Sequence, residues 1–188
     1  MADEGIFLQN TIALIWDFDK TLSPINMQEP LFEAYGIDKD DFWAEVNALP
    51  EYYRQAGIRI NNDTCYLGHI LSYVHHGRMP GLTNAKLKEF GAKIPLFPGL
   101  PDFFDDIKQL VRKPEFLEAD ISIEHYIVST GLEAMIYGTP MAAKVDDVWA
   151  SVFIEEPAVP GQDMSIAPKS GEINQIAGFL DNTTKTRA

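Results

Sequence analysis

Six residues near the start of the chain form a short, strongly apolar run. Residues 11–16 are TIALIW, and Asp17 and Asp19 follow with one residue between them. A short run that is apolar on both faces is typical of a buried strand in a parallel sheet. In an extended segment, residues i and i+2 point to the same side. The pattern therefore predicts a buried strand whose end presents two carboxylates together.

The pattern becomes helical between residues 27 and 93. Apolar residues recur at i, i+3 and i+4 over residues 30–35, 40–48 and 63–74. A further short helix is expected over residues 84–90. This block is too long for a simple crossover between parallel strands, which usually takes a dozen or so residues. We therefore expect an inserted helical cap over residues 27–93.

Strands and helices alternate along the rest of the chain. A helix is expected from residue 101, and further strands over residues 125–130 and 147–156. A helix over residues 132–138 would separate these two strands. Strands that alternate with helices predict an α/β fold with a parallel, Rossmann-like sheet. Right-handed crossovers would bring the carboxyl ends of the strands to one edge, where ligands bind in such sheets.

The predicted architecture has two parts and a long loop. Residues 1–26 and 94–188 would form the α/β core, interrupted by the cap. Residues 159–171 are expected to form a loop, and residues 181–188 to begin another helix. Asp17, Asp19 and a serine at the end of the second strand would all lie at the ligand-binding edge.

The charge and the cysteine content restrict the expected partners. A formal net charge of -13 and a pI near 4.6 argue against nucleic acid, because phosphate backbones are bound by excess lysine and arginine. A small phosphorylated molecule remains compatible, since a local cation or a metal can hold it. The single Cys65 excludes an intramolecular disulfide and fits a reducing compartment. With no signal-peptide pattern and no membrane-length apolar run, we expect a cytoplasmic protein without membrane partners.

The segment WDFDKTL resembles the first motif of the haloacid dehalogenase (HAD) superfamily. That motif is a hydrophobic strand followed by Asp-x-Asp-x-Thr and then Leu or Val, matched here by Asp17, Asp19 and Thr21. The second motif, a hydrophobic strand that ends in Ser or Thr, is matched by YIVST, with Ser129 as the preferred hydroxyl. A cap inserted after the first motif agrees as well. Taken alone, the two aspartates would favour a simple Asp-rich turn.

The resemblance implies phosphoryl chemistry. Asp17 would attack phosphorus and become an aspartyl-phosphate, while Asp19 would protonate the leaving oxygen and then activate water. Mg²⁺ would be held by Asp17 and by the backbone carbonyl of Asp19. An acid at position 19 favours phosphatases over dehalogenases, because a halide needs no proton on leaving. The phosphoryl oxygens would contact Thr21, Ser129, Thr130 and Gly131.

A lysine that neutralises the phosphoryl charge is expected after the second motif, and three are available. Lys144 precedes the third strand and Lys169 lies in a loop beside Pro168, so a solvated surface charge explains each of them. Lys185 follows the third strand at an apparent helix start, where the resemblance places the third motif. We therefore assign Lys185 as the predicted catalytic lysine.

The fourth motif of the superfamily, an acidic strand end that supplies a further Mg²⁺ ligand, has no match. Asp146 and Asp147 precede a strand, and Asp181 precedes the predicted lysine. In the superfamily the strand of this motif lies beside the first strand, so its lack would leave residues 11–16 as an apolar sheet edge. Either the chain is a fragment of a longer product, which we prefer, or another chain such as a second copy covers the edge.

Two functions follow from these features. The first is a Mg²⁺-dependent phosphohydrolase for a small phosphorylated metabolite, with weak Mg²⁺ binding and slow turnover by residues 1–188. The second is a catalytically impaired HAD-fold protein with a binding or regulatory role, suggested by the unmatched fourth motif. The identity of the substrate is not encoded in these motifs. Cationic candidates for an anionic substrate group in the cap are Arg54, Arg59 and Arg78.

Overall fold

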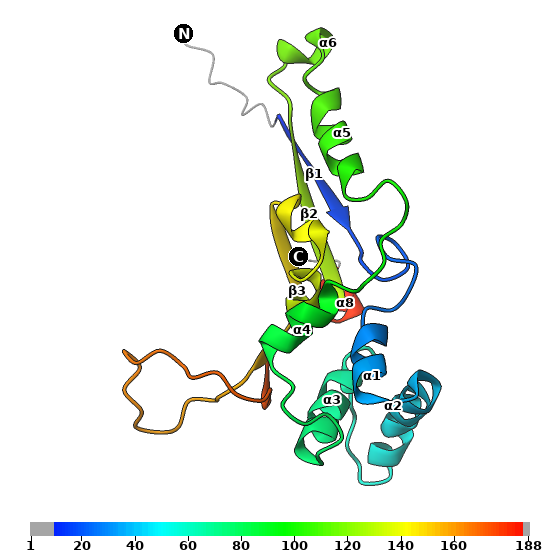
Figure 1. Ribbon diagram of the computed structural model, residues 1–188, viewed down its shortest axis with the longest axis vertical. Helices are drawn as coiled ribbons and strands as arrows, with labels where there is room; N and C mark the ends of the chain where they lie inside the picture. The colour runs from blue at the N-terminus through cyan, green and yellow to red at the C-terminus, as the bar shows by residue number, and fades with distance from the viewer. Residues whose placement is uncertain (1–9, 186–188) are drawn as a thin grey trace.

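A computed structural model describes residues 10–185, which form one four-stranded sheet with helices around it (Figure 1). The strands lie side by side in chain order. They are β1 (Thr11–Trp16), β2 (Ser122–Leu132), β3 (Asp147–Ile154) and β4 (Gln175–Gly178). The predicted α/β class is confirmed, and the three strands expected from the sequence are present. β1 pairs with β2, and β2 with β3, in parallel.

The three predicted strands pair in parallel as expected, whereas β4, which the sequence did not indicate, pairs with β3 in the antiparallel direction. The chain leaves β3, passes through a long loop that projects from the molecule in Figure 1, and returns alongside. An antiparallel neighbour needs no helical crossover, so such a loop suffices. β4 spans only four residues and ends at Gly178, which left too short a pattern for the sequence to indicate a strand.

Six helices lie between β1 and β2, and the first four form the block that the helical pattern predicts. These four are α1 (Glu29–Tyr35), α2 (Lys39–Arg54), α3 (Cys65–His75) and α4 (Asn84–Gly91). Helices α1 to α3 gather at one end of the molecule in Figure 1. Asp38 caps α2 because its side chain accepts hydrogen bonds from the backbone N–H groups of Asp40 and Asp41.

Shorter helices follow along the rest of the described chain, before β2, between β2 and β3, and after β4. They are α5 (Asp102–Leu110), α6 (Pro114–Leu117), α7 (Glu133–Ile136), the 3₁₀ helix η1 (Pro140–Ala143) and α8 (Asn182–Lys185). The expected helices after residue 101 and near residue 181 are therefore confirmed. Within residues 10–185, no helix has both the length and the apolarity needed to cross a bilayer.

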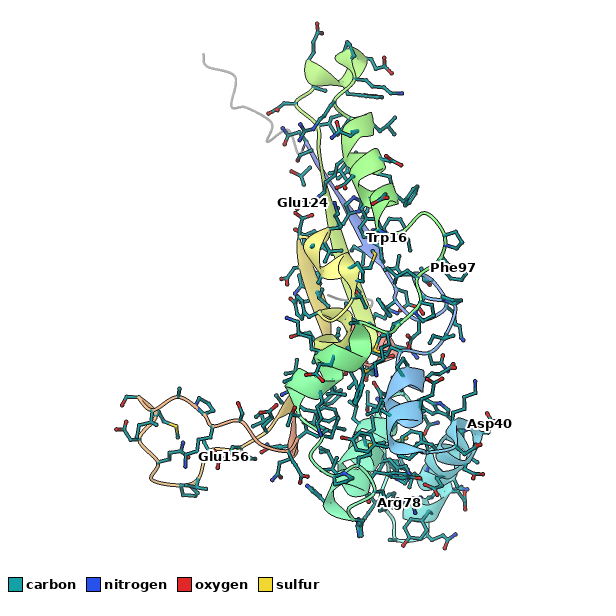
Figure 2. All side chains as sticks on the ribbon, viewed as in Figure 1. Trp16, Asp40, Arg78, Phe97, Glu124 and Glu156 are labelled. Carbon is teal, nitrogen blue, oxygen red and sulfur yellow. The ribbon has the colours of Figure 1, made fainter. Side chains whose placement is uncertain are left out.

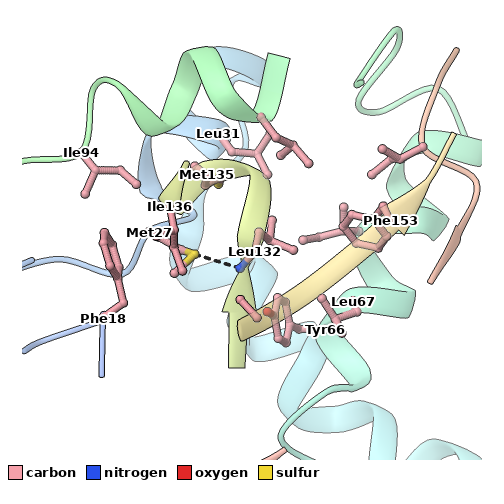
Figure 3. Close-up of a cluster of buried hydrophobic side chains, with 14 of the residues drawn as sticks. Phe18, Met27, Leu31, Tyr66, Leu67, Ile94, Leu132, Met135, Ile136 and Phe153 are labelled. Atoms are coloured by element: carbon pink, nitrogen blue, oxygen red, sulfur yellow. Dashed lines mark hydrogen bonds between the residues drawn. The ribbon is translucent and has the colours of Figure 1, made fainter. Parts of the chain in front are cut away.

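One continuous apolar core joins the helical insert to the sheet. Phe18 from the turn after β1, Tyr66 from α3 and Met135 from α7 are all buried in it (Figure 3). At its centre, the Leu132 backbone N–H lies 3.0 Å from Met27 Sδ, the contact dashed in Figure 3. The helices α1 to α3 thus pack on the same core as β2. The division into a cap over residues 27–93 and a surrounding core stays a prediction.

The first strand lies at the edge of the sheet and is not buried as its sequence predicts. Ile15 is 61% exposed and Ile12 is 46% exposed. Within the described residues, β1 pairs with β2 alone, so its other edge and part of one face meet solvent. The apolar sheet edge expected from the unmatched fourth motif is therefore present.

An aromatic stack holds the carboxyl end of β1. Trp16 lies beside α5 (Figure 2), stacked on Phe104 with ring centroids 5.1 Å apart. Phe104 in turn stacks on His125 of β2 at 4.3 Å. Trp16 Nε1 donates to His125 Nδ1 over 3.2 Å, and burial lowers the pKa of this histidine. The neutral ring therefore acts as a structural connection between β1 and β2.

Two helical glycines allow a direct stability test. A Cβ on Gly91 would overlap the backbone carbonyl of Met135, because α4 and α7 approach closely there. A Cβ on Gly68 in α3 would meet no atom within 4 Å. We expect Gly91→Ala to destabilise the fold by about 1–3 kcal/mol. Gly68→Ala should instead stabilise it by about 0.5–1 kcal/mol. Urea unfolding measures both, and equal effects would contradict the close helix contact.

Candidate active site

The two aspartates lie where the chain leaves β1. Trp16 is aligned with Ile127 of β2, so Asp17 extends toward the carboxyl end of β2. Phe18 is fully buried, and its carbonyl accepts the backbone N–H of Leu22 over 2.8 Å, which closes a tight turn. The buried Phe18 ring anchors this turn. Asp17 and Asp19 flank it and are held on a fixed piece of backbone.

Lys185 Nζ forms an ion pair with Asp17 Oδ1, although 168 positions separate them in the chain. The lysine is the last residue of α8, whose residues contact β2. Asp181 directly precedes this short helix and caps it, since its Oδ1 accepts the Thr184 backbone N–H over 2.7 Å. The structure thus brings the predicted lysine to the first aspartate.

The loop before α3 is hydrogen-bonded to the start of α8. Asn61 Nδ2 donates to Asp181 Oδ2 over 2.9 Å. The backbone N–H of Asn182 donates to Asp63 Oδ2 over 3.2 Å. Two hydrogen bonds therefore connect the helical insert to the segment that carries Lys185.

Asp19 occupies a different environment from Asp17. Its Oδ1 accepts the Met27 backbone N–H over 2.9 Å. Burial and, to a smaller extent, the nearby negative charge of Asp17 raise the pKa of the Asp19 carboxyl to about 6. The hydrogen bond from Met27 and the charges of Lys20 and Lys185 act in the opposite direction. Asp19 can therefore hold or release a proton near neutral pH.

The end of β2 contributes the second group of predicted residues. Ser129 is 2% exposed, and its Oγ accepts the Gly131 backbone N–H over 3.0 Å. The Thr130 carbonyl accepts the Tyr66 hydroxyl over 2.7 Å. A Cβ at position 131 would overlap the end of the Met27 side chain, which would then have to move. These contacts tie the end of β2 to both α3 and the segment after Asp19.

The other predicted residues lie elsewhere. Thr21 is exposed in the turn after Phe18. Lys144 forms an ion pair with Asp105 of α5 over 2.5 Å. Lys169 is exposed in the projecting loop between β3 and β4. Neither Lys144 nor Lys169 forms a described contact with Asp17 or Asp19, which leaves Lys185 as the lysine at the pair.

A pocket of about 270 Å³ opens beside Asp19, between the helical insert and the end of β2. Its polar lining consists of Asp19, Asn26, Gln28, Asn47, Asn62, Asp63 and the predicted site residue Thr130. Trp43 and Tyr66 supply aromatic surface. Among the lining residues, the sequence motifs identify only Asp19 and Thr130. Gln28, Trp43 and Asp63 belong to no motif, because the packing of the helical insert brings them here.

The cap arginines lie outside this pocket. Arg54 and Arg59 line an adjoining cavity of about 520 Å³, which shares Asn47 and Asn62 with it. Arg54 is ion-paired with Glu51. Arg78 lies over the Tyr73 ring, 5.8 Å from its centroid, at the far end of the molecule from α5 (Figure 2).

The site has few ligands for a metal. Among residues 10–185 there is no group of three or more His, Cys, Asp or Glu side chains that could hold an ion. Mg²⁺ usually takes one or two protein carboxylates and keeps several waters. The Asp17 carboxylate and the Asp19 carbonyl are hard oxygen donors of this kind, so the donor set fits Mg²⁺, with a small number of protein ligands.

Comparisons with known proteins agree with the fold. No family model matches the chain. A protein of Borreliella burgdorferi described as uncharacterized is 40% identical over 182 residues, which cover 95% of this chain and 63% of that protein. The chain thus spans less than two thirds of the length of this relative.

Two solved structures are similar. A HAD family hydrolase from Salmonella enterica serovar Typhi matches with a TM-score of 0.54 at 13% identity, over 95% of this chain and 49% of that one. A phosphoserine phosphohydrolase-like protein from Francisella tularensis matches with a TM-score of 0.46 at 20% identity, over 89% and 63%. The second score is too low to add to the assignment. The first confirms that the chain has a HAD-like fold.

The raised pKa of Asp19 predicts a pH dependence of stability. The pKa of the Asp19 carboxyl is about 6 in the folded state, against 3.8 for an ordinary aspartate carboxyl. Between these values the folded state binds more protons than the unfolded state, so this contribution is present below pH 4 and is lost as pH rises through 6. In metal-free buffer, wild type should lose up to roughly 3 kcal/mol relative to Asp19→Asn over this range. A pH-independent difference in urea unfolding would contradict the shift.

Proposed function

We propose that the chain is the site-bearing part of a Mg²⁺-dependent phosphohydrolase that acts on a small phosphorylated molecule. The observation that carries this proposal is the pairing of Lys185 with Asp17 beside a second aspartate whose pKa is raised to about 6. A nucleophile, a cation and a proton donor together are what phosphoryl transfer requires. The HAD-like fold supports the same chemistry by analogy of fold.

The first step would form a bond between an Asp17 carboxylate oxygen and phosphorus. The bond from phosphorus to the ester oxygen breaks at the same time, and Asp19 gives its proton to that oxygen. This step yields an aspartyl-phosphate and a free alcohol. Burial favours the protonated form of Asp19 in the resting enzyme, which suits a general acid with a pKa of about 6.

The second step would reverse the role of Asp19. Its carboxylate takes a proton from water, whose oxygen attacks phosphorus and releases Asp17. Inorganic phosphate leaves, and both aspartates return to their initial states. One carboxyl can serve in both directions because its pKa lies close to the working pH.

The remaining residues would bind the transferred group. Lys185 neutralises its charge, and the Ser129 hydroxyl with the N–H groups near Thr130 and Gly131 would donate to its oxygens. Thr21 is a further candidate from the motif. A bound Mg²⁺, held by Asp17 and the Asp19 carbonyl, would neutralise phosphoryl charge and orient the group for in-line attack.

A binding or regulatory role is the second candidate. It is favoured by the small number of metal ligands, since the described residues contain no group of three or more His, Cys, Asp or Glu side chains that could hold an ion. Such a protein would bind a phosphate ester and release it unchanged. A turnover assay separates the two functions directly.

The enzyme assignment is tested by four variants with p-nitrophenyl phosphate and Mg²⁺. We expect slow but measurable turnover by wild type and none by Asp17→Asn. Asp19→Asn should lose about 10²–10⁴-fold in kcat, because it removes the proton donor. Lys185→Met should lose about 10²–10³-fold. Lys169→Met, which removes a lysine from the exposed loop, is the matched control and should retain the wild-type rate.

Two results would count against the enzyme. Turnover that survives in Asp17→Asn would exclude Asp17 as the nucleophile. Undetectable turnover by wild type, together with retained binding of a phosphate ester, would favour the binding role. Beryllium fluoride, which mimics a phosphoryl group on aspartate, provides a check without turnover, since it should protect wild type but not Asp17→Asn against thermal unfolding.

A further inference from the structure

We propose that the pocket beside Asp19 selects a leaving group with a primary ammonium, so that the substrates are phosphate monoesters of small amino alcohols. This inference rests on the proposed function, because it places the alcohol released by the reaction in that pocket. Asp19, the proton donor to the ester oxygen, is itself part of the pocket lining. The group next to that oxygen must therefore enter the space between the helical insert and the end of β2.

The charges of the lining have one sign. Asp19 and Asp63 are the acidic residues that line the pocket. Asp19 carries a proton in the resting enzyme, so Asp63 supplies the negative charge, and among the described residues no lysine or arginine lines the pocket. Asp63 accepts only a backbone N–H, from Asn182, and forms no ion pair in the part of the chain that the structure describes. A carboxylate or second phosphate would meet uncompensated repulsion here, whereas a cation would be attracted.

A buried acceptor in the lining is unpaired. Gln28 is 3% exposed, and its Oε1 accepts no hydrogen bond among the described residues. The Gln28 side chain lies against the Tyr66 hydroxyl, which already donates to the Thr130 carbonyl and has no proton left for Gln28. Burial of an unpaired amide oxygen costs about 1–3 kcal/mol unless a ligand supplies a donor. A primary ammonium carries three such donors.

The aromatic lining favours the same group. Trp43 and Tyr66 both line the pocket, with ring centroids 5.7 Å apart. The face of an aromatic ring attracts a cation, and tryptophan does so most strongly. Charge and the aromatic surface thus favour an ammonium over a neutral or anionic group, and the unpaired acceptor favours a group that can donate a hydrogen bond over a carboxylate.

The nearest arginines define the main competing possibility. Arg54 and Arg59 line the adjoining cavity beyond Asn47 and Asn62, and Glu51 neutralises Arg54. A long anionic leaving group that extended from the pocket beside Asp19 across Asn47 and Asn62 would reach them. Short substrates therefore test the pocket itself.

The test uses three esters of nearly equal size that differ only in the terminal group. These are O-phosphoethanolamine, ethylene glycol monophosphate and phosphoglycolate, which end in an ammonium, a hydroxyl and a carboxylate. Calorimetry with Mg²⁺ measures their dissociation constants for wild type and for Asp17→Asn, which holds the ester without cleaving it. We expect phosphoethanolamine to bind about 10-fold tighter than the glycol ester, and phosphoglycolate to bind most weakly.

A charge introduced into the lining should change this order. Asn47→Lys places a cation in the pocket from an exposed position of α2, and should shift the preference from phosphoethanolamine toward phosphoglycolate by 10-fold or more. Ala48→Lys adds the same charge one position along the same helix, at an exposed residue outside the pocket lining. It should leave the ratio of the three affinities unchanged.

The outcomes are distinct from those of the proposed function. Tightest binding of the glycol ester or phosphoglycolate, equal affinities, or no binding of any ester would each overturn the ammonium assignment. A preference for phosphoethanolamine that Asn47→Lys reverses would support it, even if wild type cleaved none of the three. In that case the proposed hydrolysis fails while the assignment of the pocket stands.

Discussion

Two carboxylates at the end of one strand impose the constraint on which the rest of the site depends. The chain resolves their repulsion by giving each a different environment. Asp17 receives the charge of Lys185, whereas Asp19 is buried against Met27 and titrates at about 6. This asymmetry requires three distant segments to meet, namely the turn after β1, the end of β2 and α8.

The parts of the site that the sequence predicted are those defined by local order along the chain. Asp17 and Asp19 follow an apolar run directly, and Lys185 follows a recognisable break after the last predicted strand. Each therefore needed only one element to be placed correctly. Gln28 and Asp63 could not be found in this way, because their roles depend on contacts with α3, α8 and the end of β2 that no short pattern encodes.

The fold was predictable for a similar reason and failed where tertiary context decides. The helices and three strands have clear periodicities, whereas β4 gains its identity only from pairing with β3. The apolar sequence of β1 predicted burial on both faces, yet Ile15 is largely exposed. An apolar pattern indicates that a strand can pack against apolar partners. It does not show whether such partners lie among the described residues.

The hydrogen bonds that join Asn61 and Asp63 to the start of α8, donated by Asn61 and accepted by Asp63, have a consequence for the energetics of the site. The loop before α3 lines the pocket, and α8 holds Lys185, so one set of contacts is common to the pocket wall and to the cation. By thermodynamic linkage, a molecule that orders this loop also orders Lys185. A phosphoryl group that binds Lys185 stabilises the loop by the same free energy. Occupancy at one end of a substrate is thereby coupled to affinity at the other.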